Sequence, residues 1–432
     1  MTNAEWTNWA GNQRDRARRV RPGSAEEVVE EITRARAAGS TVKPVGSGHS
    51  FTGTALTGGV RIDLARLSGL VSIDRERRLA TVRAGTSLRE LNRLLAANGL
   101  ALPNLGDVDA QTVAGALATG THGTGARFGC LATFVEALTL VTGTGEVTRC
   151  DATGAADVFA AARVGIGALG VITEVTLRCV DAFVLHAQER PGRLAEVFAR
   201  LDEDIAGNDH FEIFWFPYTD RVQTKRNNRV PAHDRPLPGW RAWLDDEFLS
   251  NSVFGAACRL GRRVPATART IARIEARVLS PREYTGASHE VFCSPRRVRF
   301  TEMEYGVPRA ALPEAFTELR RIVERLPFPV VFPVEVRFAA ADDIWLSHGY
   351  GRDSAYIAIH QYIGMPYEPY FRAFDEVATA LGGRPHWGKL HWRTAADLRP
   401  AYPRFDDFRA VRDRLDPDRV FANAYTAQVL GD

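Results

Sequence analysis

The sequence has 432 residues, 45% of them hydrophobic and 25% charged, which suits a globular protein of two or three domains. Lys and Arg number 55 against 52 Asp and Glu, and no basic block is interleaved with aromatic residues, so we expect no nucleic-acid partner. No run of 18 apolar residues and no secretory leader pattern occur, so we expect a soluble, cytoplasmic protein that does not enter a membrane.

The first 180 residues predict alternating short helices and strands. A helix is expected from Ser24 to Gly39, because Ser24 can cap it, Glu27 follows three residues later, and glycine ends it. A second helix is expected from Ser87 to Asn98. Strands are expected at residues 41–45, 61–64, 70–74, 79–85, 135–141 and 170–178, two of them (61–64 and 70–74) with the alternation of half-buried strands.

From residue 181 onward the pattern changes. Strands are expected at residues 211–217, 327–338 and 354–363, with helices at 369–381 and 405–415. Residues 231–238 are rich in proline and charge and indicate a loop. Residues 255–279 have a helical period, and their many arginines are interpreted as a solvated face rather than a binding patch.

The five cysteines show no metal-site or disulfide pattern. They are odd in number, widely spaced and lack a Cys-x-x-Cys pair, which is typical of reduced thiols in a cytosolic protein. We therefore expect no metal site.

The segment from Pro44 to Gly53 is the first candidate for ligand binding. Gly46 and Gly48 allow a sharp turn whose N–H groups can form a concave anion site suited to a diphosphate. His49 projects from this turn and could be a base, a ligand or a covalent anchor. Taken alone, the segment could also be an ordinary loop with a surface histidine.

A second stretch, Gly115 to Gly129, is rich in glycine and threonine. It matches neither a Walker loop nor a dinucleotide-binding turn, but it offers many backbone donors and hydroxyls. Two such cradles suit a large, extended, phosphate-bearing ligand.

Glu335 and Arg337 are two residues apart on an otherwise apolar strand. The strand period places both side chains on one face, opposite Val334 and Val336. The pattern alone favours a structural salt bridge over a functional site, and leaves both open.

Four motifs occur in an order that resembles one enzyme family. They are Val45-Gly-Ser-Gly-His-Ser50, Asn104-Leu-Gly106, Thr119-Gly-Thr-His-Gly-Thr-Gly125 and His386-Trp-Gly-Lys389. The chain resembles FAD-linked oxidases of the vanillyl-alcohol-oxidase superfamily, and more closely the sugar-1,4-lactone oxidases (gulonolactone and arabinonolactone oxidase) and the alditol oxidases. The resemblance extends from about Asn8 to Gln428.

This resemblance implies an α+β fold with two domains. An FAD-binding domain of two small α+β subdomains would comprise residues 1–180, and a substrate cap domain with an antiparallel sheet residues 181–392. Residues 393–432 would return to the FAD domain.

The resemblance also implies the residues that bind FAD. His49 matches the position that is covalently bonded to the flavin 8α-methyl group, and Asn423 and Tyr425 match residues near the isoalloxazine. The full expected set is Val45, Gly46, Ser47, Gly48, His49, Ser50, Gly106, Asp107, Gly115, Thr119, Gly120, Thr121, His122, Thr124, Gly125, Ile172, Asn423 and Tyr425.

The expected catalytic residues are Glu335, Arg337, His360 and Lys389. Arg337 would hold the reacting hydroxyl and stabilise alkoxide charge, with Glu335 orienting it and bonding a neighbouring hydroxyl. Lys389 would stabilise the anionic reduced flavin, and desolvation could lower its proton affinity enough to make it a general base. His360 would bind substrate hydroxyls, whereas His386 and His391 are interpreted as structural.

Gly106 bears on the electron acceptor. Related dehydrogenases carry a side chain here that shields the flavin from oxygen, so glycine predicts an open path for O2. Asp107 departs from the serine of several relatives, and we assign it no substrate role.

The expected function is therefore FAD-dependent oxidation of a small polyhydroxylated substrate, with O2 reduced to H2O2, by a monomer or small homo-oligomer. An aldono-1,4-lactone of the L-gulono or D-arabinono type is favoured over an open-chain alditol. A lactone dehydrogenase with another acceptor, and a flavin-carrying sensor without turnover, remain alternatives.

Overall fold

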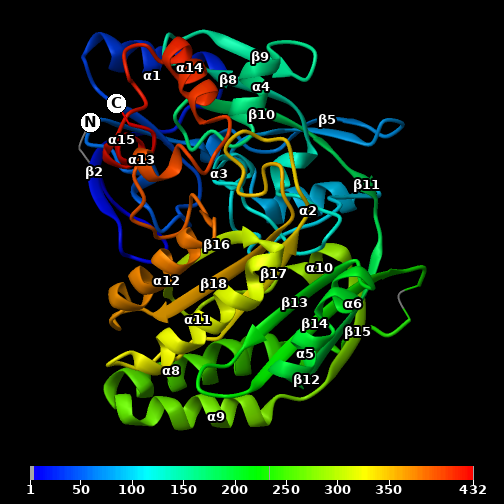
Figure 1. The fold of residues 1–432 in the computed structure, drawn as a ribbon. Helices are drawn as coiled ribbons and strands as arrows, with labels where there is room; N and C mark the ends of the chain where they lie inside the picture. Colours follow the sequence, from blue (N-terminus) through cyan, green and yellow to red (C-terminus); the bar gives the residue numbers. More distant parts are fainter. Residues whose placement is uncertain (1–3, 233, 432) are drawn as a thin grey trace.

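Two halves stacked on one another make up the molecule (Figure 1). The structure, a computed structural model, describes residues 4–232 and 234–431. The upper half contains the chain up to about residue 181 and its C-terminal end, and the lower half is built on one large sheet (Figure 1). The fold class is the predicted α+β type with an antiparallel sheet in the lower half.

The upper half holds two sheets. One has the order β1-β2-β4-β3, with β2, β4 and β3 mutually parallel, and the other is antiparallel with the order β5-β6-β10-β8-β9. Their strands are β1 Ala4–Thr7, β2 Arg14–Val20, β3 Val42–Val45, β4 Val60–Asp63, β5 Leu70–Asp74, β6 Leu79–Arg83, β8 Val135–Val141, β9 Val147–Asp151 and β10 Val171–Arg178, and a short ladder joins β7 Leu100–Ala101 to β11 Val180–Asp181. The helices between them are α1 Ala25–Ala37, α2 Leu88–Ala96, α3 Val113–Ala118 and α4 Ala156–Ala162.

The lower half is organised around an eight-stranded antiparallel sheet with the order β15-β12-β14-β13-β17-β18-β16-β19. Its strands are β12 Val184–Arg193, β13 His210–Trp215, β14 Arg221–Val230, β15 Arg282–Ala287, β16 Phe300–Pro308, β17 Val334–Ala339, β18 Ser354–Tyr362 and β19 Arg384–Pro385. The helices of this half are α5 Leu194–Ala199, α6 Leu201–Ala206, α7 Gly239–Ala242, a π-helix Trp243–Val253, α8 Phe254–Arg263, α9 Ala268–Val278, α10 Ser288–Phe292, α11 Leu312–Arg325 and α12 Glu368–Ala380.

The two faces of this sheet have different roles. On one face, alternate residues of β16, β17 and β18 pack with α11 and α12 in one hydrophobic cluster that includes Met303, Val336, Ile357, Phe316 and Phe371. Successive strand residues point to opposite faces, so the residues between these apolar positions face the upper half. That second face carries the charged side chains described below.

The C-terminal segment lies in the upper half, beside the N-terminal elements (Figure 1). It forms α13 Ala395–Leu398, α14 Phe405–Leu415 and α15 Ala424–Leu430. The backbone N–H of Val42 donates to the Val420 carbonyl at 2.7 Å, and Arg414 pairs with Asp157 at 2.6 Å. The proposed domain boundaries at residues 180 and 392 stay a prediction.

Several predicted elements are confirmed by the structure. Ser24 caps α1 by accepting from the Glu27 N–H, and Ser87 caps α2 by accepting from Glu90. The predicted helices at 369–381 and 405–415 correspond to α12 and α14.

Other elements differ from the prediction. β4 is buried along its length because it lies between two parallel strands, and β5 is largely exposed at a sheet edge, so neither is half-buried. Residues 255–279 form two helices, since the segment from Val264 to Thr267 breaks the helical run. In the segment 327–338, only residues from Val334 onward are a strand.

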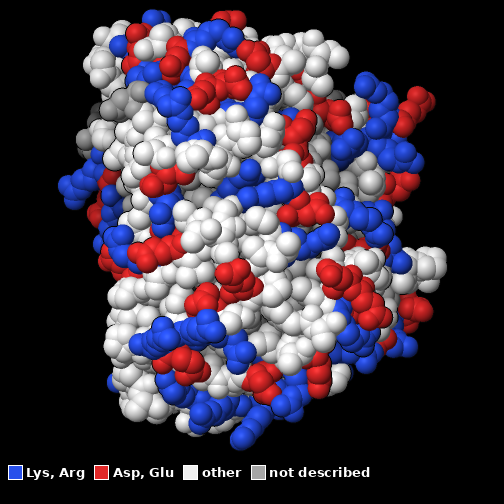
Figure 2. All heavy atoms as spheres, viewed as in Figure 1, with Lys and Arg blue, Asp and Glu red and all other residues white. Residues whose placement is uncertain are grey.

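Acidic and basic side chains are interspersed on the face shown in Figure 2. Among the described residues, no helix has both the length and the apolar character that crossing a bilayer would require.

Candidate active site

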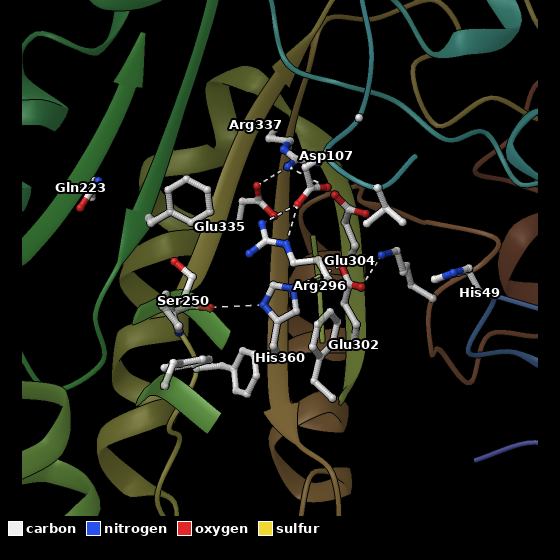
Figure 3. A pocket seen from close by; sticks show the side chains of 18 of the residues that line it. His49, Asp107, Gln223, Ser250, Arg296, Glu302, Glu304, Glu335, Arg337 and His360 are labelled. Carbon is white, nitrogen blue, oxygen red and sulfur yellow. Dashed lines mark hydrogen bonds and ion pairs between the residues drawn. The ribbon is translucent and has the colours of Figure 1, made fainter. Parts of the chain in front are cut away.

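Two adjoining cavities occur in the molecule, and the larger lies between the halves. The larger, of about 490 Å³, is lined by charged residues of the sheet, among them Glu335 and Arg337, and by Asp107 of the upper half (Figure 3). The smaller, of about 110 Å³, extends into the upper half. His49, Ser50, Gln111 and Thr119 line both, so the two form one elongated hollow.

The narrow cavity is walled by the glycine-rich turn after β3. Nine of the predicted cofactor residues line it, namely Val45, Gly46, Ser47, Gly48, His49, Ser50, Gly115, Thr119 and Ile172. Gly48 has a φ of +70°, a conformation that glycine adopts without strain. No backbone carbonyl among the described residues accepts a hydrogen bond from the N–H groups of residues 47–50. Free N–H groups at a small-residue wall fit a diphosphate, as a dinucleotide cofactor requires.

His49 stands where the narrow and wide cavities meet. Its ring stacks on Trp9, with centroids 5.5 Å apart and planes 21° apart. Burial, and secondarily the charge of Lys389, lowers the pKa of His49 to about 4. The imidazole is therefore neutral at physiological pH and has an unprotonated nitrogen.

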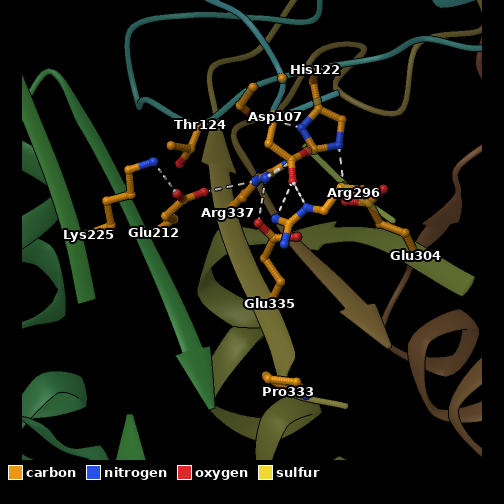
Figure 4. A network of polar contacts seen from close by, with 12 residues as sticks. Asp107, His122, Thr124, Glu212, Lys225, Arg296, Glu304, Pro333, Glu335 and Arg337 are labelled. Carbon is orange, nitrogen blue, oxygen red and sulfur yellow. Dashed lines mark hydrogen bonds and ion pairs between the residues drawn. The ribbon is translucent and has the colours of Figure 1, made fainter. Parts of the chain in front are cut away.

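Arg337 is the centre of a buried charge network in the wide cavity (Figure 4). Its guanidinium lies 2.5 Å from Glu335 Oε1, 3.1 Å from Glu212 Oε2 and 3.3 Å from Asp107 Oδ1. Glu212 is the cross-strand neighbour of Arg337 on β13, and Lys225 lies 3.8 Å behind it. The two residues predicted to share one strand face thus contact each other, and both line the cavity wall.

One guanidinium shared by three carboxylates leaves them in different protonation states. Burial would raise the pKa of Asp107, but Arg337 and Arg296 outweigh it and hold that pKa well below its usual range. Burial raises the pKa of Glu335 to about 8, and Arg337 opposes this only in part. At neutral pH Glu335 is therefore protonated, while Asp107 is an anion.

Lys389 lines the wide cavity and forms an ion pair with Glu302. Its ammonium also lies 5.3 Å from the centre of the Phe51 ring. Burial alone would lower the pKa of Lys389, but Glu302 and Glu304 raise it above its ordinary value. A protonated ammonium cannot accept a proton, so these contacts favour the charge-stabilising role of Lys389, and its expected general-base role stays a prediction.

His360 lies on β18 and faces the same cavity. Its Nδ1 is 3.2 Å from the Pro333 carbonyl, and its Nε2 is 3.4 Å from Glu302 Oε1. The rings of Phe300 and Phe332 flank it. Glu302 thus bridges His360 and Lys389.

His122 lines the wide cavity through a fixed ring. Its Nδ1 is 2.8 Å from the Gly123 carbonyl, its Nε2 is 3.2 Å from Glu304 Oε1, and it stacks on Tyr356. Together with His386, these groups are close enough to surround a cation. However, Nδ1 of His386 accepts the Gly388 N–H, which puts the proton of the neutral ring on Nε2 and leaves no free lone pair. The cluster is therefore a hydrogen-bonded wall.

Gly106, Asp107 and Thr121 complete the predicted residues of the wide cavity. A Cβ at Gly106 would lie 3.1 Å from the His122 carbonyl. Asp107, which was expected to bind FAD and was given no substrate role, links Arg337 and Arg296.

Five predicted cofactor residues line neither cavity. Thr124 and Gly125 join the halves, through bonds from Thr124 Oγ1 to the Phe211 carbonyl and from the Gly125 N–H to the Phe338 carbonyl. Gly120 lies against His348, so a Cβ there would come within 2.8 Å of that ring. Asn423 caps α15, and the Tyr425 hydroxyl donates to the Trp387 carbonyl at 2.9 Å. These residues lie behind the residues that line the two cavities, and their expected part in binding FAD stays a prediction.

Sequence reasoning missed four charged residues of the site. Glu302 and Glu304 alternate on β16 as Glu335 and Arg337 do on β17, so the same period-two pattern could have identified them. Glu212 lies in an aromatic strand, and a single acid there gave a weak signal. Arg296 lies in a loop, where no periodicity applies.

Comparisons with known proteins agree with this geometry. Residues 175–429 match the family described as D-arabinono-1,4-lactone oxidase, and residues 17–151 match the family described as FAD binding domain. The chain is 47% identical to L-gulono-1,4-lactone dehydrogenase of Mycobacterium tuberculosis over 427 residues, 99% of each chain. It is 36% identical to L-gulonolactone oxidase of Bos taurus over 95% of this chain and 94% of that one. It is 33% identical to alditol oxidase of a Streptomyces species over 98% of each chain.

Solved structures show the same fold. A solvent-stable cholesterol oxidase superposes with a TM-score of 0.85 at 20% identity, covering 100% of this chain and 98% of that one. Cholesterol oxidase of B. sterolicum gives 0.85 at 19% identity, over 99% and 97%.

Proposed function

The chain belongs to the FAD-dependent sugar-lactone and alditol oxidoreductase family, and on that premise we propose that it oxidises a carbinol of an aldono-1,4-lactone of the L-gulono or D-arabinono type. FAD, when bound, supplies the two-electron acceptor at the junction of the two cavities. The residues that would hold it are those of the narrow cavity, with Gly106, Thr121 and His122 beyond the junction.

One observation carries the proposal. Arg337, His360 and Lys389 face a single cavity that continues into the glycine-rich channel. A wall with several charged donors and acceptors matches a small substrate with many hydroxyl groups, and would leave an apolar substrate unable to satisfy these groups.

The side chains divide the work of holding the substrate. Arg337 holds the reacting hydroxyl and stabilises alkoxide charge, and Lys389 adds a second fixed positive charge. His360 is fixed by the Pro333 carbonyl at Nδ1 and by Glu302 at Nε2, and it binds a neighbouring substrate hydroxyl in the same cavity.

We propose O2 as the electron acceptor because Gly106 leaves the cavity wall without a side chain at this position. In the Gly106→Ala variant, peroxide formation should fall steeply. The anaerobic rate of flavin reduction by lactone serves as the internal control, because it reports any displacement of the substrate site by a Cβ 3.1 Å from the His122 carbonyl.

A dehydrogenase is the second candidate, favoured by the name of the relative that is 47% identical. In that case the flavin bleaches under nitrogen, an artificial dye restores it, and neither the wild type nor Gly106→Ala produces appreciable peroxide.

Substrate choice is tested with purified yellow protein, L-gulono-1,4-lactone and xylitol. Turnover on the lactone is expected to dominate, whereas turnover on xylitol alone would make the protein an alditol oxidase. Absence of flavin bleaching by either substrate would contradict the proposed activity.

We also propose that His49 is covalently bonded to the flavin 8α carbon. A neutral imidazole at the cavity junction supports this, because the bond needs an unprotonated ring nitrogen. The denatured protein should keep its yellow colour and fluorescence after acid precipitation, and His49→Ala should release or lack the flavin. Complete release of FAD from the denatured wild type would contradict the bond.

A further inference from the structure

A loop of the lower half, residues 294–297, contributes Arg296 to the lining of the wide cavity and is anchored on both sides. The N–H of Ser294 donates to the Asp107 carbonyl of the upper half at 3.0 Å. On the other side, Asn251 of the π-helix accepts from the Arg297 N–H at 2.8 Å and donates to the Pro295 carbonyl at 3.1 Å. The residue between these anchors, Arg296, is therefore held in a defined place.

The guanidinium of Arg296 lines the wide cavity. Its Nε and Nη2 lie 3.1 and 2.5 Å from Oδ2 of Asp107, whose other oxygen faces Arg337 (Figure 3). The two arginines thus bracket one carboxylate. Nη1 of Arg296 has no hydrogen-bond partner within the ranges the structure describes, and the side chain is 40% exposed, so this edge can meet a ligand.

The chemistry of a second arginine discriminates between substrate classes. A guanidinium only donates hydrogen bonds, so it is satisfied by a group that only accepts. A lactone has two such groups, its carbonyl and ring oxygens. Each hydroxyl of an open-chain alditol, in contrast, also carries a proton that needs a hydrogen-bond acceptor. Arg337 is already assigned to the reacting hydroxyl, which leaves Arg296 for the acceptor oxygen.

We propose that Arg296 is a specificity-determining residue that binds the carbonyl oxygen of the lactone and that Asp107 positions it. This inference rests on the proposed lactone oxidation and adds the group that selects a cyclic ester over an alditol. A carboxylate of the hydrolysed aldonate offers the same acceptor chemistry, so the experiment must separate the two.

The test compares Arg296→Met with Arg297→Met in the FAD-loaded protein. Met keeps much of the side-chain stem and removes the donors. Arg297 is the matched control, since it is the next residue in the loop, is exposed, pairs with Glu247 and does not line the cavity. The readouts are kcat and KM for L-gulono-1,4-lactone and the inhibition constants of γ-butyrolactone, xylitol and L-gulonate.

Arg296→Met should raise the inhibition constant of γ-butyrolactone and the KM of gulonolactone about tenfold or more, as loss of a hydrogen bond from a charged donor does. The inhibition constant of xylitol should change less than about twofold in Arg296→Met, and Arg297→Met should leave all these constants unchanged. Equal losses for lactone and xylitol would overturn the inference, as would a loss confined to gulonate or the same loss in Arg297→Met.

Asp107→Asn tests the positioning role. It should weaken the binding of γ-butyrolactone in the wild-type background. Combined with Arg296→Met, it should cause no further loss of binding, because a positioning residue acts only through its partner. Additive losses would contradict that role. Failure of the proposed function is distinguishable, because a wild type that oxidises no lactone can still report γ-butyrolactone binding through its flavin spectrum.

Discussion

At the scale of single residues, the protonation state of each buried carboxylate depends on how many arginines contact it. Glu335, Asp107 and Glu212 all contact Arg337, and only Asp107 has a second arginine. Glu335 therefore keeps its proton up to a pH of about 8. In this state Arg337 retains more of its positive charge for the substrate oxygen.

The pKa of Glu335 gives a testable pH dependence. As the pH rises through about 8, Glu335 loses its proton and adds a third negative charge beside Arg337, so kcat/KM should fall on the alkaline side. The Glu335→Gln variant stays neutral and should lack this fall, while Glu335→Asp should retain it. An unchanged alkaline limb in Glu335→Gln would assign the limb to another group.

Lys389 is expected to act through its charge and not through titration. The Lys389→Met variant should reduce the rate of flavin reduction by about 100-fold or more, since a fixed charge near developing negative charge contributes strongly in a buried site. Lys389→Arg keeps the charge and should retain much more of the activity. Because Glu302 raises the pKa of Lys389, loss of a pH limb near neutrality in Lys389→Met would contradict this role.

At the scale of elements, one residue attaches α15 to the upper half. The side-chain oxygen of Asn423 accepts from the Thr426 N–H at 2.8 Å, and its amide lies 2.9 to 3.2 Å from the carbonyls of Gly53, Thr54 and Leu56. The helix cap and the contact with the chain after the glycine-rich turn therefore depend on a single amide.

Asn423→Ala should lower the free energy of unfolding by about 1–3 kcal/mol, through lost hydrogen bonds and buried carbonyls without a donor. Asn423→Asp keeps the cap but faces three carbonyl oxygens with a carboxylate, so it should also destabilise. Urea unfolding of the holoenzyme measures both. Asn423 lines neither cavity, so the kcat of the folded variants should stay near that of the wild type.

At the scale of the whole molecule, the active site exists only because the two halves meet in one register. Thr124 of the upper half donates to the Phe211 carbonyl on β13 and accepts from the Phe338 N–H on β17 at 3.1 Å. The ion pair from Asp107 to Arg337 and the contact of His122 Nε2 with Glu304 Oε1, at 3.2 Å, cross the same boundary. Polar contacts therefore join the two halves, and they form only when the paired groups of both halves lie within bonding distance.

Thr124→Val removes this hydroxyl at nearly constant volume and leaves two buried backbone groups without their partner. We expect a loss of about 1–3 kcal/mol in unfolding free energy, whereas Thr124→Ser should keep most of the stability. Thermal unfolding monitored by flavin and tryptophan fluorescence gives the comparison. Equal stability of the Val and Ser variants would show that the hydroxyl does not contribute to the junction.

The sequence by itself determined the local elements and the family. Caps such as Ser24 and Ser87 act within one turn, and the strand period alone placed Glu335 and Arg337 on one face. The two glycine-rich turns predicted a large phosphate-bearing ligand, because such turns need residues without a Cβ, and the family resemblance of the ordered motifs identified that ligand as FAD.

Only the tertiary structure decided which charges meet. Asp107 contacts Arg296 and Arg337, and Glu302 contacts His360 and Lys389, across separations that no local pattern encodes. These contacts, together with burial, keep Lys389 protonated and Glu335 neutral. The packing of the C-terminal segment places Asn423 and Tyr425 outside both cavities. Ionisation and contact depend on the full set of neighbours, and only the packed chain supplies that set.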